Sequence, residues 1–259
     1  MAGEYRQRFT NGELKFEGSA TRGSDQNGPD ENRGHFFTNA KFDLTDTWRT
    51  ALKSELASDD TYLRRYRFRS PDPLTNHLIF ERFRSQNYAS AEGYHWRGQS
   101  VTDEAGKTPI VAPLINFNAV GTPGSHGGRW TIDVNAMALT RTTGTDSKRI
   151  SLRSGWLLPH IARTGEVYRL YATLQTDGYL VDEVQEENRA AGNLFSGFTG
   201  RVFPRVGLDW RLPFARHVEK TTQVIEPVAG IMLSPNGGNW DKIPNEDSKN
   251  IEFDDTNLV

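Results

Sequence analysis

The residues with the chemistry most useful to an enzyme are scattered along this chain of 259 residues. The adjacent acids Asp59 and Asp60 would point to opposite sides of a strand, so they cannot flank one bond and are expected in a turn. Residues 106–108, Gly-Lys-Thr, resemble the end of a phosphate-binding loop, but Val101 stands where that loop needs a glycine. No two histidines have metal-ligand spacing, so a structural role is expected for each: His35, His77, His95, His126, His160 and His217. We therefore predict no catalytic residue, metal or cofactor.

Arginine is the charged residue that follows a pattern. Arg65, Arg67 and Arg69 alternate with Tyr66 and Phe68, and further arginines recur along the chain. If the apolar faces of the strands meet lipid, these arginines must face a lumen or lie in loops, because a lipid-facing arginine costs about 2 to 4 kcal/mol at mid-bilayer. Arginines on the solvent face of a soluble sandwich are the other interpretation. The candidate residues for a polar, lumen-lining face are Arg65, Arg67, Arg153, Arg169 and Arg205.

The elements that would position these arginines are β-strands. Trp130, Ile132 and Val134 alternate with Thr131 and Asp133, which is the period of two of an extended strand with one apolar and one polar face. The same alternation recurs in at least three other stretches, and no helix of period 3.6 produces it. We predict about thirteen strands, near residues 4–10, 13–22, 34–45, 47–57, 61–69, 75–87, 89–100, 109–119, 128–142, 148–159, 165–180, 199–212 and 219–233.

Loops rich in turn-forming residues separate the predicted strands. They include residues 24–30, 121–125 and 235–239. Only the stretch around residues 186–193 looks helical. The fold class predicted from this pattern is all-β, with consecutive antiparallel strands forming a meander.

Strand length and composition favour a membrane barrel over a soluble sheet. Many predicted strands are longer than the usual 5 or 6 residues of soluble sheets, and a tilted membrane-spanning strand needs about 9 to 11. Only 36% of the residues are hydrophobic, which would give a soluble protein of this size a thin core. A hollow barrel lined by polar residues resolves this difficulty.

Net charge and the absence of cysteine exclude other classes. The chain has 31 basic and 33 acidic residues, a net charge of -2, which argues against a nucleic-acid-binding protein. It contains no cysteine, so disulfides and thiolate metal sites are excluded. The first nine residues contain charges where a signal peptide needs an apolar stretch.

The most distinctive string lies at the C-terminal end of the chain. Residues 243–248, Ile-Pro-Asn-Glu-Asp-Ser, and residues 252–258, Glu-Phe-Asp-Asp-Thr-Asn-Leu, resemble the mid-barrel signature of the LptD family, also called Imp or OstA, in its alphaproteobacterial form. Residues 34–37, 59–66, 201–204 and 225–227 are similar to strings found in that family in the same order. The signature residues are Ile243, Pro244, Asn245, Glu246, Asp247, Ser248, Phe253, Asp254, Asp255 and Asn257.

This resemblance implies a role in lipopolysaccharide transport and assembly at the outer membrane of Gram-negative bacteria, without catalysis. It implies a transmembrane barrel of about 26 antiparallel strands, which encloses an LptE-like plug lipoprotein and receives lipopolysaccharide from a periplasmic bridge through an N-terminal jelly-roll domain. We expect residues 1–259 to form about half of such a barrel, without the jelly-roll domain and without the first and last barrel strands. The expected partners are lipopolysaccharide, the plug lipoprotein, the bridge through the missing domain, and outer-membrane lipid.

Two other classes remain open from the sequence. A generic outer-membrane channel or barrel enzyme shares the strand alternation but leaves the terminal signature unexplained. A soluble β-sandwich or carbohydrate-binding module fits the low hydrophobicity and the charged N-terminus.

Overall fold

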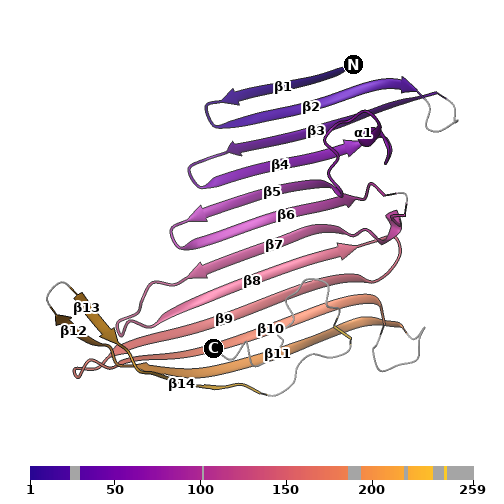
Figure 1. Ribbon diagram of the computed structural model, residues 1–259. Coiled ribbons are helices and arrows are strands. Elements are labelled where there is room, and N and C mark those ends of the chain that lie inside the picture. The colour runs from indigo at the N-terminus through magenta and orange to yellow at the C-terminus, as the bar shows by residue number, and fades with distance from the viewer. Residues whose placement is uncertain (24–29, 101, 186–193, 219–220, 236–241, 244–259) are drawn as a thin grey trace. The chain divides into compact units, whose positions relative to one another are not determined.

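The computed structural model is an antiparallel β protein (Figure 1). It describes residues 1–23, 30–100, 102–185, 194–218, 221–235 and 242–243. Twelve strands form one sheet in which each strand pairs with its neighbours in the chain, apart from the last pairing of β11 with β14. The all-β antiparallel meander predicted from the sequence is therefore confirmed.

The strands alternate with short connections, two of which contain a helical turn. The elements are β1 (Ala2–Phe9), β2 (Gly12–Gly23), β3 (Glu31–Asp43), β4 (Trp48–Ala57), α1 (Tyr62–Arg65), β5 (Leu74–Arg84), β6 (Asn87–Arg97), η1 (Ala105–Lys107), β7 (Ile110–Val120), β8 (Arg129–Thr140), β9 (Asp146–Ile161), β10 (Val167–Gln185), β11 (Leu194–Arg211), β12 (Phe214–Val218), β13 (Thr221–Ile225) and β14 (Val228–Leu233). Strands β8 to β11 have 12 to 19 residues, enough to cross a bilayer at a tilt.

Two of the predicted strands are wrong. Residues 61–69 contain the helix α1 and belong to the connection between β4 and β5. Residues 219–233 hold two strands, β13 and β14, and not one. Pro213 lies between β11 and β12, and Pro227 lies between β13 and β14. Because proline has no backbone N–H to donate, the strand pairing is interrupted at these two positions. Strands β12 and β13 therefore pair with each other in a separate two-stranded sheet. The predicted helix at 186–193 lies outside the described residues.

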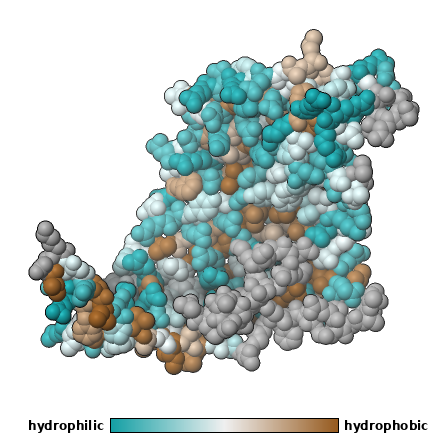
Figure 2. Space-filling view, in the orientation of Figure 1, coloured by the Kyte–Doolittle hydropathy of each residue, from teal (hydrophilic) through white to brown (hydrophobic). Residues whose placement is uncertain are grey.

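The contacts divide the chain into two compact units: Met1–Asn116 with Ala136–Lys148, and Phe117–Asn135 with Arg149–Val259. In each unit, one face of the strands exposes large apolar side chains and the other carries polar ones. The exposed apolar residues of the first unit include Tyr5, Phe36, Leu52, Leu56, Leu78 and Phe80, and those of the second include Trp130, Ile132, Ile150, Leu170, Leu174, Phe198, Val202 and Val206. Figure 2 shows hydrophilic side chains gathered over the first strands and hydrophobic ones on the β12–β13 hairpin.

Buried apolar residues form two small clusters among the described residues. In the first unit, Phe37 and Ala57 pack with Tyr62 and Leu63 of α1 and with Leu74. In the second unit, Tyr179, Val181 and Val184 of β10 pack with Ile243. Neither cluster is the continuous core of a soluble sandwich.

Candidate functional site

The polar face of the second unit is formed by β9, β10 and β11. The register pairs Thr173 with Arg205 and Asp177 with Arg201, so alternate residues of β10 and β11 lie side by side on one face. Arg153 of β9 joins this face because its guanidinium donates to Oε1 of Gln175 at 3.0 Å. The members of this polar face include Ser151, Arg153, Arg169, Tyr171, Thr173, Gln175, Asp177, Arg201, Arg205 and Asp209.

A buried ion pair holds one end of this face together. Asp177 and Arg201 are 3% and 6% exposed, and Nε of Arg201 donates to Oδ2 of Asp177 at 2.6 Å. The same carboxylate accepts hydrogen bonds from Ser151 and from the side-chain amide of Gln175. A buried pair is tolerated when its remaining lone pairs are satisfied in this way. The network therefore fixes the relation of β9, β10 and β11 at this point.

The structure places three of the five predicted lumen arginines on this polar face. Arg169 donates through Nε to Asp209 at 2.7 Å, which neutralises its charge. Among the described residues, the guanidinium of Arg153 hydrogen-bonds to the neutral amide of Gln175, and Arg205 lies opposite Thr173. Whether this face borders a lumen stays a prediction.

The other two predicted arginines are not on a strand. Arg65 is the last residue of α1, and Arg67 follows it with a φ of 59°, a left-handed conformation unsuited to a strand. The alternating residues 65 to 69 therefore do not form a strand, and the side chains of Arg65 and Arg67 are exposed. Two neighbours in the helix, Tyr62 and Leu63, are fully buried, so α1 folds onto the polar face of the first unit beside Phe37 of β3.

A bidentate ion pair attaches this helical connection to β3. Arg33, with 4% of its surface exposed, donates through Nε to Oδ2 of Asp59 at 2.8 Å and through Nη2 to Oδ1 at 2.5 Å. Thr61 also donates to Asp59 through its backbone and its hydroxyl. The guanidinium of Arg33 is the main cause that holds the pKa of Asp59 well below its usual range. Asp59 lies in the connection between strands, as predicted.

A serine and a histidine meet beside α1. Oγ of Ser19 lies 2.7 Å from Nδ1 of His35 and 2.8 Å from the hydroxyl of Tyr62. The imidazole is packed against the rings of Phe37 and Phe68 at 4.8 and 4.5 Å. In the part of the chain that the structure describes, no carboxylate forms a salt bridge with His35. The imidazole is held by ring packing and by one hydroxyl contact, and its structural role stays a prediction.

Of the predicted signature residues, only Ile243 is described. Its side chain is 9% exposed and packs against Tyr179, Val181 and Val184 of β10. Nζ of the preceding Lys242 lies 4.4 Å from the ring centre of Phe195. The signature therefore begins against β10. The other predicted signature residues lie outside the described part: Pro244, Asn245, Glu246, Asp247, Ser248, Phe253, Asp254, Asp255 and Asn257.

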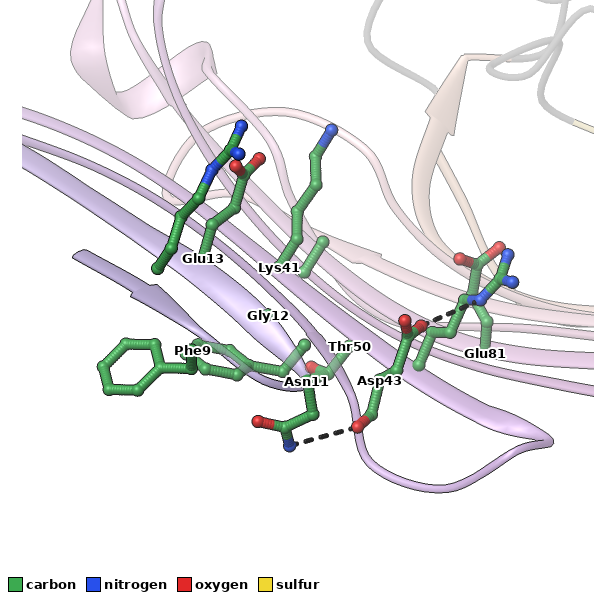
Figure 3. A pocket seen from close by; sticks show the side chains of 12 residues that line it. Phe9, Asn11, Gly12, Glu13, Lys41, Asp43, Thr50 and Glu81 are labelled. Carbon is green, nitrogen blue, oxygen red and sulfur yellow. Dashed lines mark hydrogen bonds and ion pairs between the residues drawn. The ribbon is translucent and has the colours of Figure 1, made fainter. Parts of the chain in front are cut away.

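A cavity of about 590 Å³ lies in the first unit at the turn ends of β1 to β5 (Figure 3). Glu13 and Lys41 are cross-strand partners whose side chains extend to the same side, and Nε of Arg49 lies 3.0 Å from Oδ1 of Asp43. The lining contains equal numbers of acidic and basic residues: Glu13, Asp43 and Glu81 against Arg8, Lys41 and Arg49. Such a mixed lining has no preference for either sign of charge.

Sequence reasoning missed the carboxylates that pair with the arginines. Asp177 and Arg201 are 24 residues apart and meet through the register of β10 and β11. Arg33 and Asp59 are 26 residues apart and meet because the connection after β4 folds back onto β3. Residues 58–61, Ser-Asp-Asp-Thr, are of types that favour a turn before a helix. This local pattern could have predicted the connection that holds Asp59.

Within the described residues, no three His, Cys, Asp or Glu side chains are grouped to hold a metal ion. No helix in that part of the chain is long and apolar enough to cross a membrane.

Comparison with known proteins gives one family. The model of the family "LptD: LPS transport system D" matches residues 31–259, which is most of the chain and includes every strand from β3 onward. No curated protein matches the chain. The antiparallel meander and the exposed apolar strand faces agree with the outer-membrane β-barrel character of that family. The chain belongs to the LptD family, whose role is the transport and assembly of lipopolysaccharide at the outer membrane.

Proposed function

We propose that this chain forms part of the wall of a larger outer-membrane barrel, with its polar faces toward a lumen that lipopolysaccharide enters and its apolar faces toward lipid. The observation that carries this proposal is the division of each unit into an exposed apolar face and a polar face, in a chain whose family handles lipopolysaccharide. A larger barrel also gives the edges at β1 and β14 a partner, because closure removes unpaired strand edges.

The proposed role involves binding and passage, with no covalent chemistry. The polar face of the second unit offers arginines, hydroxyls and amides suited to sugars and anionic groups. On the polar face of the first unit, α1 and its connection take up space beside β3, which would narrow a lumen there. We propose that an LptE-like plug lipoprotein contacts these polar faces as well, and that the protein resides in the outer membrane.

Photocrosslinking from the two faces tests the proposal. A photoreactive phenylalanine analogue would replace Tyr94 or Tyr171 on the polar faces, and Phe80 or Leu174 on the apolar faces. We expect the polar-face positions to crosslink to lipopolysaccharide in living cells, and a crosslink to a lipoprotein as well would identify the proposed plug. The matched apolar-face positions should crosslink to membrane lipid. Equal lipopolysaccharide yields from both faces, or none from the polar faces, would contradict the proposal.

A further inference from the structure

Two arginines on the polar face of the second unit have no carboxylate partner among the described residues. Arg153 of β9 and Arg205 of β11 lie on the two strands that flank β10, and both belong to its polar face. Arg153 contacts the neutral side chain of Gln175, at 3.0 and 3.3 Å. In the described residues neither arginine has an ion pair, whereas Arg169 on the same face has Asp209. An uncompensated pair of like charges is unfavourable and is relieved by an anion.

Two buried polar atoms next to these arginines have no hydrogen-bond partner among the described residues. Thr173 of β10 stands directly opposite Arg205 in the register. Its Oγ1 and the Nε of Arg205 are both buried and have no hydrogen-bond partner among the described residues. Buried polar groups in native proteins nearly always have a partner, so these two neighbouring groups are a donor and an acceptor that a ligand could use.

Glycines lie near Thr173 on both flanking strands, and neighbouring side chains occupy the space above them. A methyl group added to Gly155 of β9 would lie 3.7 Å from Cγ2 of Thr173, which places this glycine beside it. On β11, a methyl group at Gly207 would lie 2.2 Å from the ring of Tyr171, so that ring occupies the space above the glycine. The phenol of Tyr171 thus lies on the same face as Arg205, two residues from Thr173.

We propose that Arg153, Arg205 and Thr173 form a binding site for one anionic group of a glycolipid head, a phosphate or a carboxylate. A guanidinium is the donor best matched to the paired oxygens of these groups. The inference rests on the proposed function, because only a lumen brings glycolipid to this face. The neighbouring Asp177–Arg201 pair, already satisfied, holds β10 and β11 in the register that the site needs.

The test uses the full chain in cells, with the photoreactive analogue at Tyr171 as the probe. The double variant Arg153→Gln/Arg205→Gln should reduce the crosslink to lipopolysaccharide about tenfold, equivalent to about 1.4 kcal/mol. The control is Arg163→Gln/Arg211→Gln, which also removes two positive charges from this unit: Arg163 lies in the turn between β9 and β10, and Arg211 ends β11, where it pairs with Glu226. Its yield should equal that of the unaltered chain. Equal yields from both double variants would overturn the site.

Two further arms identify the anion and guard against misfolding. With purified full chain in detergent, inorganic phosphate should compete with lipopolysaccharide for the crosslink at Tyr171, which requires no arginine variant. If phosphatase treatment of the lipopolysaccharide abolishes the crosslink, the bound group is a phosphate. If the crosslink is lost only with lipopolysaccharide that lacks uronic acids, the bound group is a carboxylate. Indifference to all three would refute the site. If Tyr94 crosslinks to lipopolysaccharide and Tyr171 does not, the site fails while the proposed function stands; if neither does, the proposed function fails too.

Discussion

Replacing Asp59 with Asn should release the α1 connection from β3. The change keeps the shape of the side chain but removes the charge that compensates the buried guanidinium of Arg33. Breaking a fully buried ion pair costs about 3 to 5 kcal/mol, and breaking an exposed one costs about 0 to 1 kcal/mol. The side chain of Arg33 is 3% exposed and that of Asp59 is 27% exposed, so solvent partly screens the pair. We therefore expect an intermediate cost of about 2 kcal/mol, a roughly thirtyfold rise in opening of the connection.

Hydrogen–deuterium exchange measures this opening directly. Three amide hydrogen bonds report on it: Arg65 to Thr61 at 2.9 Å, Tyr66 to Tyr62 at 3.1 Å and Phe68 to Leu63 at 2.9 Å. Their protection should fall about thirtyfold in the Asp59→Asn variant while the strands keep theirs.

The matched control is the neighbouring acid. Asp60 pairs with Arg97 at 2.9 Å, and both side chains are more than one third exposed, so Asp60→Asn should lower protection by no more than about fivefold. Equal effects of the two variants would refute the view that the Arg33 pair holds α1 in place.

The same pair gives the opening a pH dependence. The pKa of Asp59 is lowered in the closed connection, and an open connection returns it to about 3.9. The stabilisation is therefore complete above about pH 4 and is lost as the pH falls through the lowered pKa. Protection corrected for intrinsic exchange should decline below about pH 4 in the unaltered chain and stay flat in the Asp59→Asn variant.

Three further predictions concern the second unit, and unfolding by urea in lipid vesicles measures each. Ile132→Lys on the apolar face of β8 should cost about 2 to 4 kcal/mol, and the adjacent Asp133→Lys on the polar face should cost far less; equal costs would contradict the assignment of faces. Gly207→Ala should lower the free energy of unfolding by about 1 kcal/mol because the added methyl group displaces the ring of Tyr171. The same substitution in a Tyr171→Ala background should have no effect, and a cost that persists there would show that the backbone is the cause. Ile243→Ala should cost about 2 kcal/mol because it leaves a cavity beside β10, and an unchanged unfolding curve would show that this contact contributes little.

Much of the sheet could be predicted because alternation is a local property of the chain. The faces assigned to Trp130, Ile132 and Val134 follow from the period of two alone, and the structure exposes the first two on the apolar side. The same rule failed at residues 61–69, where arginines and aromatics alternate by chance. There the partner of Asp59 is Arg33, a residue far back in the chain, and that contact keeps the segment off the ladder.

The arginine clusters could not be predicted because they depend on register. Asp177 meets Arg201 only with the observed pairing of β10 and β11, which includes a shift between Val181 and Val184. A bulge of this kind changes which residues face each other, and Glu183 inside it has a φ of 59°. Nothing in the period of the sequence fixes such a shift, since a slip of one residue exchanges the two faces.

The division between polar and apolar faces also sets when the chain can fold. In a soluble domain, water drives collapse because apolar side chains leave it for the interior. Here the large apolar side chains of the strands point away from the polar faces, the buried apolar clusters are small, and the mean hydropathy is -0.66. Pairing the strands in water would leave those side chains wet, so the gain comes only when lipid covers them. In the outer-membrane placement proposed above, the bilayer would supply the driving force that a hydrophobic core supplies in a soluble domain, and folding and insertion would be one event.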